Sequence, residues 1–220
     1  MESGFGIIEG VFSQKECDSL LAELRLPGVQ RSRAGARHLM GQAAVGRVAS
    51  DERMMAIARE ALSGAAAPYR ATLFEKSGES NWLVVWHQDT AVPLRARFDA
   101  PGWGPWSTKA GICYAHAPTW ALERIVALRL HLDASRADNG PLRVIPDSHR
   151  RGVLSDDEVF AVAHRQSHVE CLVERGGVLA MRPLLIHSSP KAESPEPRRV
   201  LHLEYAESLE LAEGIRLAVA

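Results

Sequence analysis

Two side chains that could bind a metal ion lie one residue apart in VVWHQDTAVP, residues 84–93. His87 and Asp89 follow an apolar run typical of a β-strand, and alternate residues of a strand point to the same face, so both can converge on one ion. An imidazole and a carboxylate are two of the three ligands in the 2-His-1-carboxylate facial triad, which holds Fe(II) and leaves positions open. The pattern therefore predicts an iron site if a second histidine is available.

The same spacing recurs at His131 and Asp133 in LRLHLDAS, where Arg129 shares their predicted face. A short motif of this kind carries a known risk of false matches. Either pair could instead be an aspartate that opens a turn beside a histidine whose hydrogen bonds are satisfied. A third ligand has to decide between the two pairs.

A further histidine and an arginine occur late in the chain, in LLIHSSPKAESPEPRRVLHLEYA. His187 ends an apolar run and Arg198 follows eleven residues later, a separation that can span one hairpin and place the two on neighbouring strands. The planar guanidinium fork binds a carboxylate through two hydrogen bonds, which suits a dicarboxylate that chelates the same iron. His87, Asp89, His187 and Arg198 thus form a chemically complete set.

Two helices followed by short strands are expected to position these residues. Ser13 and Glu16 have capping-box spacing at the start of SQKECDSLLAEL, and a second helix is expected in SDERMMAIAREALSG, with Ser50 as N-cap and Gly64 as C-cap. After Gly64, seven or eight strands separated by turn residues favour a sandwich or barrel with a helical flank. The runs are YRATLFEK, NWLVVWHQD, RIVALRLHLD, PLRVIP, HVECLVE, GVLAMRPLLIH and RRVLHLEYA.

The segment from about residue 90 to 122 is rich in Pro, Gly, Trp and Arg, and we expect it to be irregular. A loop of that length in a compact domain usually has a function, so it is expected to lie over the mouth of a site. Trp103 and Trp106 in this segment are candidates for substrate contact. The alternative is that these tryptophans pack in a core or anchor the loop.

Four segments together resemble the phytanoyl-CoA dioxygenase family of Fe(II)- and 2-oxoglutarate-dependent oxygenases. In chain order they are WHQDT, DNGPLRVIPDSHRRGVL, GGVLAMRPLLIHSSP and RRVLHLEYA, and GIIEGVFSQKECDSLLAEL is similar to the family's amino-terminal helix region. The resemblance implies a mainly β fold with flanking helices, a cupin-like double-stranded β-helix (jelly roll). It also implies Fe(II), 2-oxoglutarate as co-substrate and dioxygen, with hydroxylation of a small organic metabolite and decarboxylation of 2-oxoglutarate to succinate and CO2.

Carried over by position, the resemblance makes His87 and Asp89 the proximal metal ligands and His187 the distal one, and these three are the catalytic candidates. It assigns the C5 carboxylate of 2-oxoglutarate to Arg198, because in the family a basic residue that faces outward follows the binding arginine, as Arg199 does here. Related iron halogenases replace the carboxylate ligand by a small residue. The presence of Asp89 therefore favours hydroxylation over halogenation.

Gln88 matches a residue that lies near the co-substrate in the family, and Lys76 stands where a lysine recurs just before the metal motif. Both are secondary candidates for binding the co-substrate. The second pair, His131 and Asp133, leaves too few strands before the distal histidine of a double-stranded β-helix. Arg129 beside it is a candidate for binding a substrate carboxylate, because an inward arginine needs an anionic partner. An ion pair with Asp133 or another acidic neighbour is the alternative.

Length and composition indicate an ordinary globular protein. The length of 220 residues favours a single domain that spans residues 1–220. We expect a helical flank at about 1–66 and a jelly-roll core at about 70–206. The 26 basic and 27 acidic side chains form no basic block, which makes nucleic acid an unexpected partner. The widely spaced Cys17, Cys113 and Cys171 favour reduced thiols and a cytoplasmic location, and we expect no leader and no membrane segment.

Two other functions are compatible with these residues. One is a jelly-roll protein that binds a metal or a ligand without oxygenase turnover, and the other is a jelly-roll enzyme that uses the metal but not 2-oxoglutarate. The substrate is expected to be a small molecule whose identity the sequence does not reveal, and the oligomeric state is equally unreadable.

Overall fold

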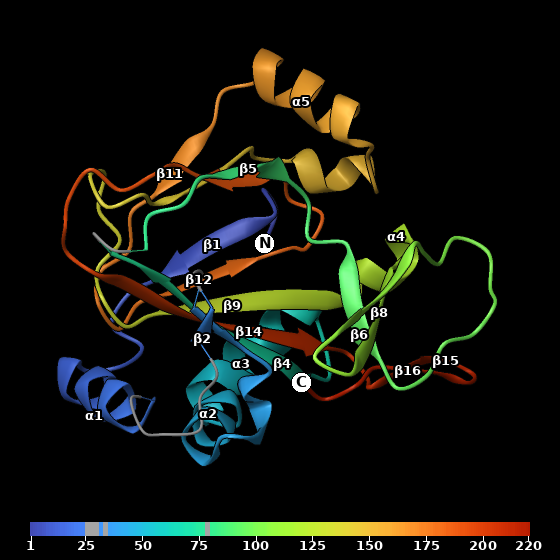
Figure 1. The fold of residues 1–220 in the computed structure, drawn as a ribbon, viewed down its shortest axis with the longest axis horizontal. Helices are drawn as coiled ribbons and strands as arrows, with labels where there is room; N and C mark the ends of the chain where they lie inside the picture. Colours follow the sequence, from blue (N-terminus) through green and yellow to red (C-terminus); the bar gives the residue numbers. More distant parts are fainter. Residues whose placement is uncertain (25–30, 33–34, 78–79) are drawn as a thin grey trace.

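The computed structural model describes residues 1–24, 31–32, 35–77 and 80–220, and its centre is a pair of facing β-sheets (Figure 1). In spatial order the larger sheet contains β1 (Phe5–Ile8), β12 (Val178–Met181), β9 (Ile125–His131), β14 (Arg198–Ala206), β4 (Ala67–Lys76), β3 (Gly35–Arg37) and β2 (Arg31–Ser32). The smaller sheet contains β11 (Val169–Cys171), β10 (Leu142–Val144), β13 (His187–Ser189) and β5 (Val84–His87). This arrangement is a double-stranded β-helix, which confirms the predicted fold class.

Two further sheets lie at the end of the jelly roll that appears on the right in Figure 1. One has the strand order β6 (Ala91–Leu94), β8 (Ile112–His116) and β7 (Trp106–Lys109), and the other pairs β15 (Glu210–Ala212) with β16 (Ile215–Arg216). The expectation of an irregular segment at 90–122 is therefore corrected, because three of its stretches pair into a sheet. Pro93 inside β6 and the polar composition of β7 hide the alternation by which strands are recognised.

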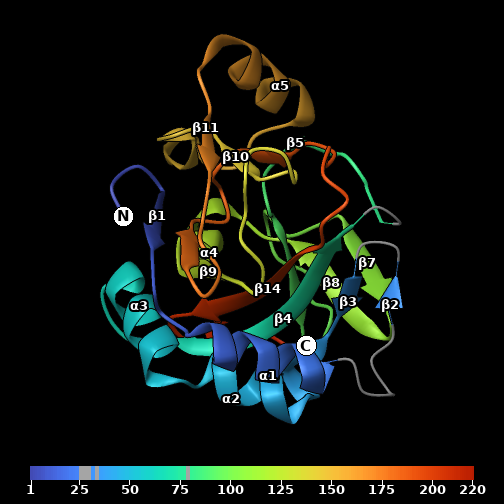
Figure 2. The same ribbon diagram turned by 90° about the vertical axis from the view of Figure 1, so that its left-hand side faces the viewer.

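Three helices, α1 (Gln14–Leu24), α2 (Ala43–Ala49) and α3 (Glu52–Leu62), cover the outer face of the larger sheet (Figure 2). The remaining helical elements are α4 (Thr119–Leu122), α5 (Asp156–Arg165), which lies outside the smaller sheet, and the 3-10 turns η1 (Leu39–Gly41) and η2 (Ser148–Arg151). The expected helical flank also contributes β1, β2 and β3 to the larger sheet. Among the described residues, no helix combines the length and the apolar character needed to cross a membrane.

The two faces of the larger sheet differ in chemistry because its strands alternate. Leu73, Leu128 and Leu201 lie on the outer face, in one apolar cluster with residues of α1 to α3. On the inner face, one end of the barrel is filled by a second apolar cluster that includes Leu142, Leu179, Met181 and Leu185. The rest of the inner face carries polar side chains from β4, β9 and β14: Arg70, Thr72, Lys76, Arg129, Arg198, His202 and Glu204.

The helix caps that the sequence predicts are present at α1 but shifted at α3. At α1 the predicted capping box is present, because the Ser13 N–H donates to Glu16 at 2.7 Å and the Glu16 N–H donates to the Ser13 hydroxyl at 3.3 Å. At α3 the N-cap is Asp51, whose carboxylate accepts the Arg53 N–H at 2.9 Å, and the C-cap is Ser63. The predicted caps at α3 were each wrong by one residue, because Ser50 instead ends α2, a helix of small residues that the sequence pattern does not reveal.

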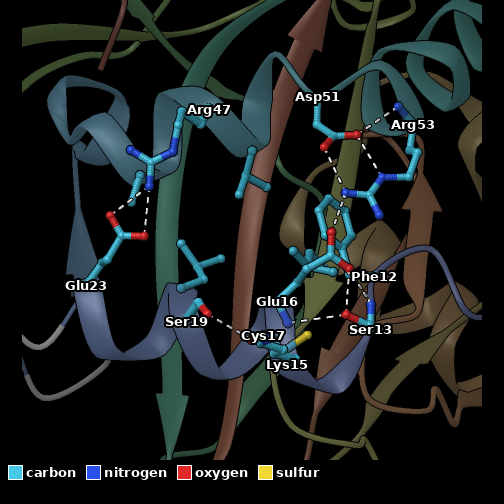
Figure 3. A pocket seen from close by; sticks show the side chains of 14 residues that line it. Phe12, Ser13, Lys15, Glu16, Cys17, Ser19, Glu23, Arg47, Asp51 and Arg53 are labelled. Carbon is cyan, nitrogen blue, oxygen red and sulfur yellow. Dashed lines mark hydrogen bonds and ion pairs between the residues drawn. The ribbon is translucent and has the colours of Figure 1, made fainter.

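A shallow hollow of about 410 Å³ lies between α1 and the following helices (Figure 3). Its acidic and arginine side chains pair with one another, since Arg53 contacts both Glu16 and Asp51 at 2.8 Å and Arg47 contacts Glu23 at 2.7 Å. These ion pairs fasten α1 to α2 and α3. Among the described residues that line this hollow, no acid or arginine is left unpaired to attract a ligand.

Candidate functional site

The two predicted histidine ligands lie side by side on neighbouring strands of the smaller sheet. β5 ends at His87, β13 begins at His187, and the antiparallel register sets these residues opposite each other with ring centroids 4.2 Å apart. Asp89 follows β5, and its backbone N–H donates to the carbonyl of Pro183 at 2.9 Å. The strand register thus brings His187 beside His87 and Asp89, which lie far from it in the sequence.

Each imidazole is held by the carbonyl two residues before it. The Nδ1 of His87 lies 2.8 Å from the Val85 carbonyl oxygen, and the Nδ1 of His187 lies 2.8 Å from that of Leu185. Donation from Nδ1–H leaves the Nε2 lone pairs free, and these atoms lie 3.6 Å and 3.5 Å from the two carboxylate oxygens of Asp89. The ligand atoms of the three residues all lie within 4.8 Å of one another, so the group fits a facial triad around one metal ion.

The protonation states suit metal binding. Burial, together with the neighbouring His87, lowers the pKa of His187 to about 3, so this imidazole is neutral. Burial alone would raise the pKa of Asp89, but the two imidazoles hold it well below its ordinary value and the carboxylate is ionised. For His87 burial acts against protonation, yet the Asp89 carboxylate raises its pKa, so a proton competes with a metal ion there more than at His187.

A cavity of about 320 Å³ opens beside this group, and its charge is strongly one-sided. Asp89 is the one acidic residue among the described residues that line it. The cationic residues that line it number six: Arg37, Arg70, Lys76, Lys109, Arg129 and Arg198. Such a cavity favours anions.

Arg198 and Lys76 form the inner corner of the cavity, on adjacent strands where they pair directly in the register. Arg198 is 4% exposed and Lys76 is 1% exposed. The Ser189 hydroxyl lies between them, 2.7 Å from the Lys76 ammonium and 3.4 Å from the Arg198 guanidinium. Burial and the neighbouring cations lower the pKa of Lys76 to about 7 and that of Arg198 to about 9, which is what two buried cations without an anion should show.

The segment DNGPL supports this corner. The Asn139 carbonyl accepts the Nε–H of Arg198 at 3.1 Å, and the Gly140 carbonyl accepts the hydroxyl of Ser189 at 2.9 Å. Gly140 has a φ of 72°, and a Cβ there would lie 2.6 Å from the Pro190 carbonyl and 3.1 Å from the Lys76 ammonium. A glycine is therefore required for the backbone to approach so closely.

Ser189 was missed by sequence reasoning. It lies two residues after His187 on the same short strand, so the alternation that links His87 to Asp89 could have indicated it. The adjacent Arg199 points away from the cavity, where its guanidinium bonds to Asp133 at 2.6 Å and 2.8 Å. This placement agrees with the choice of Arg198 over Arg199 as the inward arginine.

The second His-X-Asp pair is not part of the triad. His131 is buried and its Nδ1 lies 3.0 Å from the Arg129 carbonyl oxygen, while Asp133 is taken by Arg199. Arg129 lines the cavity, and its expected alternative, an ion pair with Asp133, is wrong because Asp133 is engaged elsewhere.

Of the remaining predicted residues, Gln88 lies at the cavity, whereas Trp103 and Trp106 lie away from it. Gln88 lines the cavity, but its amide is used by the backbone: it donates to the carbonyls of Gly152 and Leu184 and accepts the Leu154 N–H.

Trp103 and Trp106 do not line the cavity. Their rings pack edge-on against Phe98, each with centroids 5.1 Å apart, in the alternative role of loop and core packing. The tryptophan that lines the cavity is Trp82, whose ring centroid lies 5.6 Å from the Lys76 ammonium.

The sequence profile described as Phytanoyl-CoA dioxygenase (PhyH) matches residues 1–200. A search of curated proteins found no match.

Several solved structures share the fold, and each covers 93% of this chain. EctD from S. alaskensis with bound Fe has a TM-score of 0.67 at 24% identity, with 73% of that chain covered. HygX from Streptomyces hygroscopicus with nickel and 2-oxoglutarate bound has a TM-score of 0.64 at 19% identity, with 83% covered. The non-heme alpha ketoglutarate dependent carbocyclase SnoK from nogalamycin biosynthesis has a TM-score of 0.70 at 14% identity, with 80% covered.

Proposed function

Because the chain belongs to the phytanoyl-CoA dioxygenase family, we propose that it is a non-haem Fe(II)- and 2-oxoglutarate-dependent dioxygenase. The proposed reaction is hydroxylation of a small organic metabolite, coupled to conversion of 2-oxoglutarate into succinate and CO2. The observation that carries the proposal is that the His87, Asp89 and His187 group shares one cavity with the buried Arg198. Iron and 2-oxoglutarate, the expected cofactors, are each bound in solved structures of the same fold.

His87, Asp89 and His187 would hold the metal. Iron bound there supplies the activation of dioxygen, and three protein ligands leave positions free for a chelating co-substrate. The residues' own share is orientation, because the carbonyls of Val85 and Leu185 fix the imidazole planes. The ionised Asp89 supplies the single negative charge of the set.

The inner corner would bind the distal carboxylate of 2-oxoglutarate. Arg198 can donate two parallel hydrogen bonds to a carboxylate, and the Lys76 ammonium adds a second positive charge beside it. The Ser189 hydroxyl, which donates to the Gly140 carbonyl, accepts from both cations and holds them in place. The binding of an anion here offsets the cost of burying two cations, which the lowered pKa values of Lys76 and Arg198 express. The apolar cluster that includes Leu142 fills this end of the barrel.

Hydroxylation is the proposed outcome because Asp89 occupies the carboxylate position that halogenases leave open. Structures with the same fold include an epimerase, SnoN, as well as the carbocyclase SnoK, so the product has to be identified directly.

Succinate formation tests the proposal. Purified protein is supplied with Fe(II), 2-oxoglutarate, air and a broad panel of small metabolites, and succinate and new products are measured by mass spectrometry. We expect Fe(II)-dependent succinate formation that is lost in His187→Ala. Metal binding with no consumption of 2-oxoglutarate, across the whole panel, would instead support a metal-binding or ligand-binding protein without turnover.

The Arg198→Ala variant tests the second alternative, a jelly-roll enzyme that uses the metal but not 2-oxoglutarate. Turnover that is unchanged in this variant would favour an enzyme that uses the metal but not 2-oxoglutarate, since the proposed anchor for the co-substrate would then be dispensable.

A further inference from the structure

Arg129 is a buried cation that forms no direct ion pair with an acidic side chain in the described part of the chain, and the Asp89 carboxylate only partly opposes the lowering of its pKa by burial. Its side chain extends from β9 into the cavity and is 6% exposed. The Nη1 donates to Nδ1 of His202 at 3.0 Å, and the guanidinium carbon lies 5.3 Å from the ring centroid of Phe74. The buried Nε–H has no hydrogen-bond partner within the described parts of the chain. Burying a guanidinium in this way costs stability, and burial lowers its pKa.

The neighbouring carboxylates are all engaged. Asp133 is held by Arg199, and Glu204 is held by Arg70 at 3.2 Å and by His202 at 3.1 Å. Asp89 belongs to the candidate metal group. With Asp89 committed to a metal ion, an anion that enters the cavity would be the group that satisfies the charge of Arg129.

The co-substrate does not account for Arg129, if the proposed function is correct. One carboxylate of 2-oxoglutarate is assigned to Arg198 and Lys76, and the other would be neutralised at the metal ion held by the His87, Asp89 and His187 group. Arg129 lies in the same cross-strand row as Thr72 and His202, four residues along β4 from Lys76. At 3.3 Å per residue the backbone of Arg129 is roughly 13 Å from the inner corner along the strand, although its charge still helps to lower the pKa values of Lys76 and Arg198. After both carboxylates of 2-oxoglutarate are assigned, neither of them binds the Arg129 guanidinium.

The outer end of the cavity is also positively charged. Arg37 and Lys109 line it, and neither has an acidic partner among the contacts of the described residues. Arg70 lies next to them and is neutralised by Glu204. With both carboxylates of 2-oxoglutarate in place, the cavity still carries excess positive charge, and a cavity of one sign concentrates ligands of the opposite sign.

We propose that Arg129 binds an oxyanion of the substrate, so that the substrate of this enzyme is a small organic anion, a carboxylate or a phosphate. Arg37 and Lys109 at the outer end draw the anion in, and Arg129 holds it beside the metal group. This inference rests on the proposed function, and it adds the charge class of the substrate to it.

A charge-matched set of probes tests the inference. The probes are hexanoate, hexyl phosphate, hexanamide and hexylamine, titrated calorimetrically into protein that is already saturated with Ni(II) and 2-oxoglutarate. We expect at least one anion to bind about tenfold or more tightly than the amide and the amine, as one charge-assisted hydrogen bond supplies. The two anions distinguish a carboxylate substrate from a phosphate substrate.

Arg129→Met should abolish this preference for anions while leaving the affinity for 2-oxoglutarate unchanged. The same variant should raise the unfolding temperature of the metal-free protein, because it removes a buried charge without a direct ion pair among the described residues. Arg199→Met is the matched control, and it should lower the unfolding temperature because it leaves Asp133 unpaired.

Three results would overturn the inference: equal or no binding of all four probes, an anion preference that survives in Arg129→Met, or a lower unfolding temperature of that variant. Loss of 2-oxoglutarate affinity in Arg129→Met would assign the arginine to the co-substrate and would overturn it as well. If the unaltered protein does not bind 2-oxoglutarate with Ni(II), the proposed function itself fails, which is a different result from loss of the anion preference alone.

Discussion

The chain contains two His-X-Asp pairs at strand ends, and they have opposite fates. His87 and His131 are oriented alike, each with Nδ1 against the carbonyl two residues earlier. They differ in the residue across the ladder, because His87 pairs with His187 whereas His131 pairs with Val200. The spacing of a motif orients the side chains, but the strand register decides whether a third ligand meets them.

The two aspartates show the same contrast. Asp89 faces the two imidazoles and the cavity, while Asp133 turns to the Arg199 guanidinium and its backbone N–H. A carboxylate paired with an arginine within the protein contributes to stability, and one surrounded by metal-ligating imidazoles is available for chemistry. Substitutions at the two positions should therefore separate function from stability.

The largest effect is expected for Asp89→Ala. Removing a ligand should weaken iron binding by more than about 100-fold, since loss of mere outer-shell partners already costs about 10- to 100-fold. Succinate formation should disappear with it. Iron content by metal analysis after gel filtration checks the prediction, and retention of stoichiometric iron would contradict the role of Asp89.

A smaller loss is expected when the inward arginine of the Arg198–Arg199 pair is changed. Arg198→Ala should weaken 2-oxoglutarate binding by about 10- to 100-fold, the value of one or two charge-assisted hydrogen bonds. Arg199→Ala is the neighbouring control and should leave that affinity unchanged. Anaerobic titration calorimetry measures both, and the reverse pattern would show that the assignment of the two arginines is inverted.

Lys76 should make 2-oxoglutarate binding depend on pH. Burial and the nearby arginines lower the pKa of Lys76 to about 7, so in the free site the amine loses its proton above that pH. The bound dicarboxylate favours the ammonium and raises its pKa, so binding takes up a proton, and affinity falls as pH rises from about 7 to 9, by at most about tenfold per unit. Lys76→Met should bind more weakly and without this slope. A slope that persists in Lys76→Met would assign the proton to another group.

The smallest effect is expected for Asp133→Asn. Its ion pair with Arg199 is partly exposed, with side-chain exposures of 15% for Arg199 and 18% for Asp133, so the free energy of unfolding should fall by about 1 to 2 kcal/mol. Iron content and succinate formation should be preserved. Urea denaturation measures the loss, and a loss of iron in this variant would mean that the second pair also takes part in metal binding.

The sequence could predict the residues whose position follows from strand alternation. The spacing of His87 and Asp89 could be interpreted from the alternation of a single strand. The inward direction of Arg198 was predicted from the family resemblance, in which an outward basic residue follows the binding arginine. The capping box of α1 was equally local.

Features that depend on contacts across the fold escaped prediction. The β6–β8–β7 sheet carries a proline and polar strands, so its pairing is visible only in three dimensions. The sequence could not show that Trp82, and not Trp103 or Trp106, lines the cavity. All three are near the motif in the sequence, but Trp103 and Trp106 pack against Phe98, a contact that only the fold reveals. Arg129 was predicted to face inward, with an ion pair to Asp133 or another acidic neighbour as the alternative to a substrate carboxylate. The engagement of Asp133 by Arg199 depended on the register between β9 and β14.

Anaerobic titration of Fe(II) in the presence of 2-oxoglutarate tests the central claim most directly, because the iron chelate of 2-oxoglutarate has a visible charge-transfer band. We predict one Fe(II) per chain with this band in the unaltered protein and in Asp133→Asn, and neither the iron nor the band in Asp89→Ala or His187→Ala. Iron binding with the band retained in His187→Ala, or lost in Asp133→Asn, would contradict the assignment of the metal centre to the first pair.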